Sequence, residues 1–370
     1  MLSLKMGNGK LSNNILHLFI VITLAISSCL VSLSQANHLP EQRKRLQLNQ
    51  CNIFKGHWVR DASYPMYDSS QCPDIRKEFD CLKYGRTDTN YLKYRWQPDD
   101  CDIPRFDGVD FLRRMRGKKI MFIGDSLSLN YYQSLICLLH AAIPNSKITH
   151  PSTGGMKSWF YQDYNVTVTM YSSLYLVDIE KEQQGRVMKL NSIKNGKIWK
   201  EMDVLVFNTW LWWNIRGAKQ SWDYIQDGSV IQKDMDRTVA FRKALMTWAK
   251  WVDSEIDPKK TKVFFQGTNP LHYDGKEWNA TRAKDCSKEI RPVKGSTYPT
   301  RAPPALDVVK QVLSTISKPV YLLDITLLSQ LRKDGHPGPY NGFHGMDCNH
   351  WCIAGLPDTW NQLLYTTLIM

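Results

Sequence analysis

The stretch Gly124-Asp125-Ser126 places a serine directly after a short apolar run, Ile120–Ile123. The run has the length of a buried strand, and apolar residues at helical spacing follow the serine, so the pattern predicts a strand, a tight turn and a helix. Ser126 would then project from the carboxyl edge of a sheet, beside the unpaired N–H groups of a helix start. That position suits a nucleophile whose acylation creates an oxyanion. A simple N-cap serine is the alternative, and the tripeptide favours neither interpretation.

Asp347 and His350, near the C-terminus, supply the partners that a nucleophilic serine needs. Because they stand three positions apart, the carboxylate can reach one ring nitrogen, fix the tautomer and leave the other nitrogen to accept the proton of serine. The alternative is a structural loop with a surface histidine. His336 and His344 are also candidate bases, although neither follows an acidic residue by three positions.

Nine cysteines indicate an oxidising compartment. One of them, Cys29, lies in an apolar N-terminal segment, and the other eight predict four disulfides whose pairing stays open: Cys51, Cys72, Cys81, Cys101, Cys137, Cys286, Cys348 and Cys352. A zinc site at Cys348, His350 and Cys352 is the competing interpretation. The spacing C-x-H-x-C is not a usual structural zinc pattern, so no metal site is predicted. The sequons at Asn165 and Asn279 agree with lumenal exposure.

The N-terminus predicts entry into the secretory pathway. Lys5 and Lys10 precede a mostly apolar segment, Ile15–Leu33. The small residues Ser34 and Ala36 then offer a cleavage site after Ala36. The segment is also close to the minimum length of a membrane-spanning helix. Residues 1–36 are therefore either a cleaved signal peptide or an uncleaved type II signal-anchor, and both place the body of the protein in the lumen.

Composition narrows the class of partner. The 370 residues are 43% hydrophobic, which argues for a well-packed globular protein. The formal net charge of +13 suits an acidic partner such as an acidic polysaccharide, but charge alone favours the alternative of an unspecialised basic surface. No long basic run and no nucleic-acid motif is present, so no nucleic-acid partner is predicted.

The chain divides into a polar stem at 37–50, a cysteine-rich segment at 51–107 with little helical periodicity, and a main domain at 108–370. In the main domain, strand and helix patterns alternate, which predicts an α/β fold with a mostly parallel sheet covered on both faces. The later expected strands are 203–207, 262–265 and 320–324, and the expected helices after the serine are 234–252, 303–316 and 356–369. Residues 167–171 and 174–177 suggest an extra strand pair in an insertion.

Together, the G-D-S tripeptide and the D-x-x-H near the C-terminus resemble the SGNH/GDSL-type hydrolase arrangement. The surrounding residues are similar to the plant trichome birefringence-like family of polysaccharide O-acetyltransferases. The similarity runs from about Cys51 to the C-terminus and is carried by these stretches: Gly124-Asp125-Ser126-Leu127 with Asn130, Asp347-Cys348-Asn349-His350-Trp351-Cys352, Cys51-Asn52-Ile53-Phe54-Lys55-Gly56-His57-Trp58-Val59, Tyr94-Arg95-Trp96-Gln97-Pro98 and Asn208-Thr209-Trp210-Leu211-Trp212-Trp213.

The resemblance implies an SGNH-like three-layer sandwich with the cysteine-rich segment packed on it. It also implies that Ser126 is the nucleophile, His350 the base and Asp347 its orienting partner. Asn208 is the expected side-chain donor of an oxyanion hole, with a strand-capping turn residue as the alternative. The glycine that related hydrolases use there is placed at Gly154 or Gly155. Among the cysteines, the family pattern implies the pairs Cys51–Cys101 and Cys72–Cys137.

Four aromatic side chains invite an interpretation as sugar-stacking groups, namely Trp210, Trp212, Trp213 and Trp222. Core packing is the commoner fate of tryptophan, so only one or two of them are expected to contact substrate, with Trp212 and Trp213 as the candidates.

Three functions follow from this resemblance and these residues. The first is an acetyltransferase acting on a wall polysaccharide (pectin, xylan or mannan) in the Golgi, with an acetyl donor and no other cofactor. The second is an acetylesterase with the same triad, and the third is a non-catalytic polysaccharide-binding protein. The expected location is the Golgi membrane, or the cell wall if the signal is cleaved.

Overall fold

The computed structural model describes residues 50–153 and 156–370. Its central feature is an eight-stranded sheet in the order β14-β13-β10-β3-β7-β6-β4, with β5 beside β6. The parallel strands are β3 (Lys119–Gly124), β7 (Val166–Ser172), β10 (Val204–Phe207), β13 (Lys262–Gln266) and β14 (Val320–Leu323). The antiparallel edge consists of β4 (Ile148–Thr149), β5 (Ser152–Thr153) and β6 (Met156–Tyr161).

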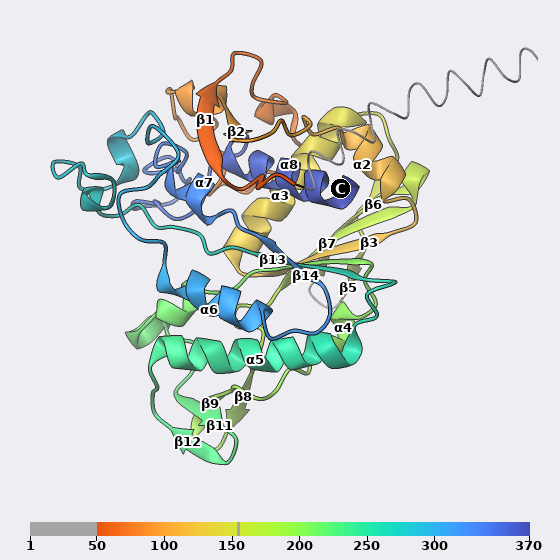
Figure 1. The fold of residues 1–370 in the computed structure, drawn as a ribbon, viewed down its shortest axis with the longest axis vertical. Coiled ribbons are helices and arrows are strands. Elements are labelled where there is room, and N and C mark those ends of the chain that lie inside the picture. The colour runs from red at the N-terminus through yellow and green to blue at the C-terminus, as the bar shows by residue number, and fades with distance from the viewer. Residues whose placement is uncertain (1–49, 154–155) are drawn as a thin grey trace, which may run out of the picture. The chain divides into compact units, whose positions relative to one another are not determined.

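Helices cover both faces of this sheet (Figure 1). One layer holds α3 (Ser126–Ala142), α8 (Leu356–Ile369) and α2 (Gly108–Arg114), and the opposite layer holds α5 (Arg237–Glu255), α6 (Pro304–Leu313) and the short α4 (Gly196–Trp199). Strand β3 contributes to both layers because its side chains alternate. Phe122 contacts Tyr131 of α3, whereas Met121 and Ile123 join the hydrophobic core with α5. The predicted α/β three-layer sandwich with a mostly parallel sheet is confirmed.

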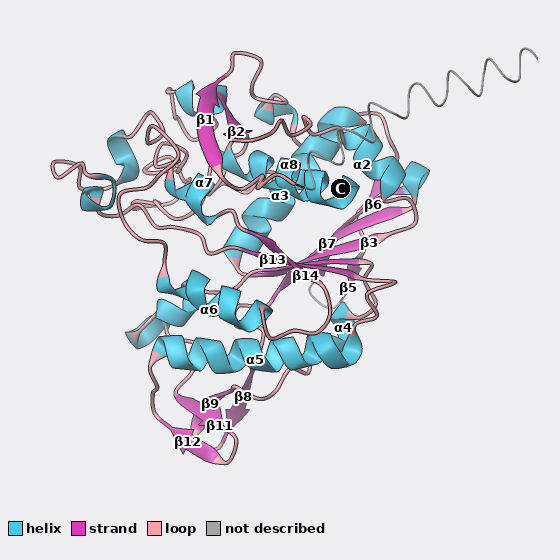
Figure 2. Cartoon of the chain, in the orientation of Figure 1, coloured by secondary structure: helices cyan, strands magenta, loops and turns pink. Residues whose placement is uncertain are grey.

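A second, four-stranded sheet lies beyond α5 (Figure 2). It contains β8 (Asp178–Glu182), β9 (Gly185–Lys189), β11 (Tyr224–Asp227) and β12 (Val230–Gln232). Met188 and Ile225 of this sheet belong to the same core cluster as Leu245 of α5, so the small sheet shares the core of the main one. The sequence patterns above do not predict it, because its strands are short and mostly polar.

The cysteine-rich segment packs on the main domain, as predicted. Strands β1 (Gly56–Arg60) and β2 (Tyr94–Pro98) form an antiparallel pair, and Trp58 of β1 donates its indole N–H to the carbonyl of Leu328 in α7 (Thr326–Gln330). Two disulfides join the segment to the rest, Cys72–Cys137 and Cys81–Cys352. The short 3-10 helices are η1 (Ser69–Gln71), η2 (Asn90–Lys93), η3 (Gln162–Tyr164), η4 (Leu211–Asn214), η5 (Gly217–Lys219), η6 (Gly275–Trp278) and η7 (Cys286–Lys288).

The expected strand pair at 167–171 and 174–177 is wrong. Strand β7 is a central strand that pairs in parallel with β3, so it is no part of an insertion. Residues 174–177 form no strand. Leu176 has a φ of 63°, which breaks an extended conformation, and its side chain is buried in the core.

The predicted N-terminal signal or anchor, the stem up to residue 49 and Cys29 lie outside the described residues. Among the residues that the structure does describe, no helix has both the length and the apolar character to cross a bilayer. Asn165 and Asn279 of the two sequons are exposed. The predicted domain boundaries remain predictions.

Candidate active site

Ser126 is the first residue of α3, at the carboxyl end of β3. The turn between them needs a glycine, because a Cβ atom on Gly124 would lie 2.3 Å from the carbonyl oxygen of Asn208 and 2.4 Å from Ser128 Oγ. Asp125 then caps the helix by accepting the N–H of Leu127 at 2.9 Å. The local sequence therefore places the serine hydroxyl at the edge of the sheet where open α/β folds hold their ligands.

Asp347 and His350 meet Ser126 from a loop 221 or more residues away. His350 Nδ1 lies 2.7 Å from Asp347 Oδ2, and His350 Nε2 lies 2.7 Å from Ser126 Oγ. The other carboxylate oxygen of Asp347 accepts the backbone N–H groups of Asn349 and His350, each at 3.0 Å. The structure therefore brings together the three residues that the sequence analysis selected, in the order carboxylate, imidazole and hydroxyl.

Charge and hydrogen bonding keep Asp347 ionised. Burial by itself raises the pKa of this carboxyl, but the hydrogen bond and charge of His350, together with the two backbone N–H groups, hold the pKa of Asp347 at about 2. An ionised carboxylate only accepts hydrogen bonds, so Nδ1 of His350 must carry the proton. In the neutral ring, Nε2 is then the free acceptor and faces the serine hydroxyl, as a general base must.

Several long-range contacts hold the loop that carries this pair. Asp347 forms an isolated antiparallel bridge with Gly338. Disulfides flank His350, since Cys348 pairs with Cys286 and Cys352 pairs with Cys81. Because both cysteines form disulfides, neither thiolate is available for the zinc site considered above. In the described part of the chain, no group of three or more His, Cys, Asp or Glu side chains could hold a metal ion.

The disulfide pattern supports one of the two pairs implied by the resemblance. Cys72 pairs with Cys137, as expected. Cys51 and Cys101 are both disulfide-bonded, and their mutual pairing stays a prediction. The pairing of Cys81 and of Cys286 with the loop was not predicted, because nothing in the spacing of the cysteines distinguishes these partners.

The other candidate bases do not contact the serine. His336 is buried, and its ring nitrogens lie 2.7 Å from the carbonyl oxygen of His350 and 2.6 Å from Nδ1 of His272. Burial lowers the pKa of His336 and that of His272, so both rings favour the neutral form. His344 is exposed on the surface. His336 therefore contacts the backbone of His350, and neither His336 nor His344 replaces His350 as the partner of Ser126.

Asn208, the expected oxyanion donor, is buried at the end of β10 and next to the serine turn. Its Nδ2 donates to Asp125 Oδ1 at 2.8 Å, which uses one amide hydrogen and leaves a second. The Asp125 carboxyl is buried, and its second oxygen has no hydrogen-bond partner. Burial raises the pKa of Asp125 to about 6, although the hydrogen bonds that it accepts and the charge of His350 lower the pKa. Gly154 and Gly155 lie outside the described residues.

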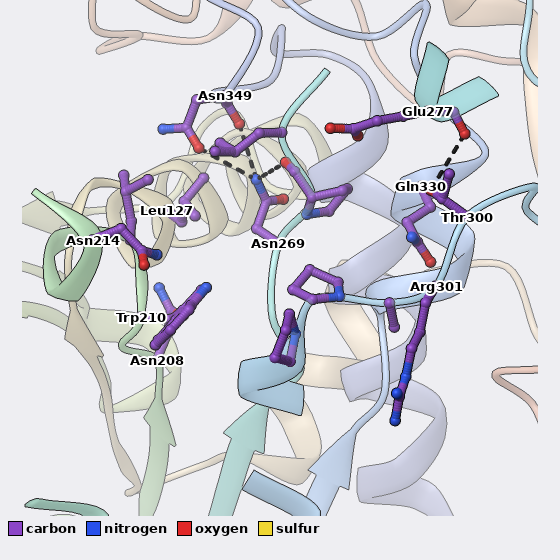
Figure 3. Close-up of a pocket in the computed structure, with 16 residues that line it drawn as sticks. Leu127, Asn208, Trp210, Asn214, Asn269, Glu277, Thr300, Arg301, Gln330 and Asn349 are labelled. Carbon is purple, nitrogen blue, oxygen red and sulfur yellow. Dashed lines mark hydrogen bonds between the residues drawn. The ribbon is translucent and has the colours of Figure 1, made fainter. Parts of the chain in front are cut away.

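A cavity of about 470 Å³ opens beside the serine turn. Three residues of the candidate site lie at one end of it (Figure 3): Leu127, which follows Ser126, Asn349, which precedes His350, and Asn208, the oxyanion candidate. Carboxamides are its most frequent polar groups, from Asn208, Asn214, Asn269, Gln330 and Asn349, and one acidic and one basic side chain, Glu277 and Arg301, line the far end. Such a mixture of amides and apolar surface suits a neutral, hydroxyl-bearing ligand group.

The tryptophans divide differently from the prediction. Trp213 is 0% exposed and donates to Thr209 Oγ1 inside the core, so its assignment to substrate is wrong, and Trp222 is buried beside it. Trp212 is partly buried against the same core and is not a lining residue of the cavity. Trp210 does line it. In this 3-10 turn, the side chains point to different sides, and the sequence does not show which one faces the cavity.

Asn269 is a cavity residue that the sequence analysis missed. Its amide donates to the carbonyls of Pro270 and Asn349 at 2.8 and 3.1 Å, and its oxygen accepts the indole N–H of Trp351 at 2.8 Å. It lies just beyond the carboxyl end of β13, as Asn208 lies just beyond that of the neighbouring β10. An amide residue after a predicted parallel strand was the available signal.

Comparison with known proteins agrees with this architecture. Residues 103–367 match the PC-Esterase family, described as a GDSL/SGNH-like acyl-esterase family found in Pmr5 and Cas1p, and residues 49–102 match the PMR5 N-terminal domain. Protein trichome birefringence-like 38 of Arabidopsis thaliana is 56% identical over 329 residues, which cover 89% of this chain and 86% of the relative.

Two other relatives from the same plant extend the comparison. Protein trichome birefringence-like 39 is 51% identical over 90% of this chain and 91% of its own length. Protein trichome birefringence is 36% identical over 87% of this chain and 57% of its own length. With a serine turn, a D-x-x-H loop and a disulfide-linked N-terminal segment on an SGNH-like sheet, the chain belongs to the trichome birefringence-like family.

Proposed function

We propose that the protein is an O-acetyltransferase that moves acetyl groups to hydroxyls of a plant cell-wall polysaccharide through an acetyl-serine intermediate. The observation that carries the proposal is the contact of His350 Nε2 with Ser126 Oγ at 2.7 Å while Nδ1 is held by Asp347. A serine with a correctly oriented imidazole can take up an acyl group. The family's description as an acyl-esterase family supports ester chemistry at this serine.

In the first half of the proposed reaction, Ser126 Oγ attacks the acetyl carbonyl carbon of the donor while His350 Nε2 takes the hydroxyl proton. The negative charge that develops on the carbonyl oxygen is stabilised by the backbone N–H of Ser126 at the start of α3 and by the remaining amide hydrogen of Asn208. His350 then returns the proton to the leaving oxygen of the donor, which departs and leaves the acetyl-serine ester.

In the second half, a sugar hydroxyl gives its proton to His350 Nε2 and its oxygen attacks the acetyl-serine carbonyl. Collapse of the tetrahedral intermediate releases the acetylated sugar, and the proton on His350 returns to Ser126 Oγ. The cavity beside Leu127 and Asn208 is the proposed place for the acceptor, with Trp210 as the aromatic surface against a sugar ring. Pectin, xylan and mannan are the candidate acceptors: the net charge of +13 agrees with an acidic polymer such as pectin, and the amide-rich lining of the cavity agrees equally with neutral xylan or mannan.

Hydrolysis is the second candidate, with water in place of the sugar hydroxyl. Two observations favour it: the family is described by esterase chemistry, and the His350 side chain is 19% exposed, so solvent reaches the base. Transfer and hydrolysis share the acetyl-serine and differ only in which nucleophile reaches it. A non-catalytic binding protein is the weaker third candidate, because binding alone does not require the oriented Ser126–His350–Asp347 chain.

The test uses the purified full chain, an isotope-labelled acetyl ester of 4-methylumbelliferone as donor, and deacetylated pectin, xylan and mannan in separate reactions. Mass spectrometry of the Ser126 peptide and of each polymer follows the label, with Ser126→Ala as the control variant. Label that passes from Ser126 to one polymer supports the transferase. Label released only as acetate supports the esterase. Equal turnover by the Ser126→Ala variant refutes both assignments.

The location remains part of the proposal. The disulfides of the described residues support a secretory-pathway protein, since such bonds persist in oxidising compartments. We place the catalytic domain in the Golgi lumen, on a type II anchor, or in the cell wall if the N-terminal segment is cleaved.

A further inference from the structure

We infer that Asn130 is a positioning residue that fixes the histidine loop to the helix carrying the nucleophile. The inference rests on the proposed function, because it concerns the geometry between Ser126 and His350. Asn130 lies one turn after Ser126 on α3, and residues four apart on a helix share a face. Its side chain is 0% exposed.

The side-chain amide of Asn130 forms two hydrogen bonds with the backbone of a single residue, Trp351. Its Oδ1 accepts the backbone N–H of Trp351 at 2.8 Å, and its Nδ2 donates to the backbone carbonyl of Trp351 at 3.1 Å. Trp351 directly follows His350 in the chain. One side chain, one turn into α3, therefore connects this helix to the residue beside the proposed general base, 221 positions away in sequence.

The disulfides and the Trp351 ring contacts connect the histidine loop to elements other than α3. The disulfides attach Cys348 to Cys286 and Cys352 to Cys81, and neither partner belongs to α3. The ring of Trp351 is held by the side chain of Asn269 and stacks on His336 with centroids 3.9 Å apart. These contacts make the loop rigid, but the link from Asn130 relates it directly to the serine.

A separate link is needed because the hydrogen bond between Ser126 and His350 does not persist through the reaction. Once Ser126 Oγ is acylated it has no proton to donate, so this contact cannot hold the imidazole during the second half. His350 must nevertheless remain in place to activate the acceptor. A misplacement of about 1 Å costs on the order of a hundredfold in rate. The two hydrogen bonds between Asn130 and Trp351 do not involve Ser126, so they can persist when the serine is acylated.

A matched control exists on the same layer of the molecule. Asn361 of α8 is also buried, and its Nδ2 contacts the carbonyl of Tyr131 and Ser134 Oγ, both on α3. It links α3 to another element through a carboxamide, as Asn130 does, but it contacts no residue of the histidine loop through these bonds. Replacement by alanine removes buried hydrogen bonds in both cases, so both variants are expected to unfold at a lower temperature than the unsubstituted protein.

The experiment measures the rate at which a fluorophosphonate labels Ser126 in the full chain, a readout that needs neither the natural donor nor the acceptor. At a temperature where both variants are folded by circular dichroism, Asn130→Ala is expected to label about tenfold or more slowly than the unsubstituted protein. Asn361→Ala is expected to stay within about threefold. Equal rates for Asn130→Ala and the unsubstituted protein, or equal slowing in both variants, overturn the inference.

Asn130→Asp provides a second test with a pH signature. A protonated carboxyl has the same shape as the amide, accepts the Trp351 N–H and donates to the Trp351 carbonyl, whereas the ionised form has no donor. The labelling rate of this variant relative to the unsubstituted protein is expected to rise as the pH falls from 8 to 5. A ratio that does not change with pH overturns the inference. If the unsubstituted protein itself is not labelled at Ser126, the proposed function fails instead.

Discussion

The two halves of the candidate site are built in different ways. The serine half is a buried strand, a glycine turn and a capped helix, and its local structure follows from residues that are close in sequence, such as the cap that Asp125 forms with the N–H of Leu127. The histidine half is a loop without helix or long strand. Its shape depends on partners far away in sequence, among them Cys81, Cys286 and Asn130.

This difference separates the features that expose the proposed nucleophile, Ser126, from those that would make its hydroxyl reactive. The strand–helix junction exposes a hydroxyl at the sheet edge, but an unassisted serine is a weak nucleophile. Reactivity depends on the loop, whose backbone must hold the imidazole within hydrogen-bonding distance. Changes in the loop, or in the residues that bind it, should therefore reduce turnover, while changes in the helix layer that do not contact the loop should mainly alter stability.

The largest effect is expected for Asp347→Asn in the loop. The new amide nitrogen would face Nδ1 of His350 as a donor, which favours the tautomer with the proton on Nε2, and that nitrogen could no longer accept the serine proton. We expect turnover of an acetyl ester to fall by about 10³- to 10⁴-fold with little change in KM. Steady-state kinetics measure it. A loss of less than about tenfold would show that Asp347 does not orient the base.

A smaller effect should separate two disulfides that close loops of nearly equal length. Cys286–Cys348 spans 62 residues and flanks Asp347, whereas Cys72–Cys137 spans 65 residues and ends in the middle of α3. Because loop length sets the entropic stabilisation, replacing either pair by alanines should cost a similar free energy of unfolding, on the order of 4 kcal/mol.

Turnover should then distinguish the two variants. Without Cys286–Cys348, we expect turnover to fall about tenfold, because Cys348 and the adjacent Asp347 are no longer held in place. Without Cys72–Cys137, we expect turnover to change by less than about twofold. Urea unfolding and kinetics on the same samples provide both numbers. An equal loss of turnover in the two variants would contradict the division of roles between loop and helix.

The smallest effect is one of stability, at Asp125 in the serine half. Its pKa is about 6 in the folded protein against 3.8 for a free aspartate, because burial disfavours the charge. Between these two values, Asp125 ionises in the unfolded state before it does in the folded state, so its contribution to the free energy of unfolding falls as the pH rises from about 4 to 6 and is then constant.

The variant Asp125→Asn carries no charge and keeps an oxygen for Leu127 and Asn208. Relative to the unsubstituted protein, it should gain about 1 to 3 kcal/mol at pH 7 and nothing at pH 4. Thermal unfolding at several pH values measures this gain. For Asp347 the sign is opposite. Its pKa of about 2 gives a stabilisation that is present above pH 4 and is lost as the pH falls towards 2.

Much of the candidate site could be predicted from local sequence. The apolar run before Gly124 and the helical spacing after Ser126 specify a strand–turn–helix, because each depends only on residues that are neighbours in the chain. The D-x-x-H spacing likewise lets Asp347 reach His350 within one turn of backbone. Alternation of strand and helix patterns predicted the parallel sheet and its two covering layers.

The remaining features were decided by tertiary structure. Strand β7 pairs with β3, Trp213 lies in the core while Trp210 faces the cavity, and Cys81 pairs with Cys352 across 271 positions. Asn269 and Gln330 join the cavity from separate elements. Each of these facts concerns residues that are distant in sequence or turns that have no periodicity. The sequence determined which local structures and reactive groups the chain contains. Only packing decided which of those groups meet, because contacts between distant segments depend on how the whole core closes.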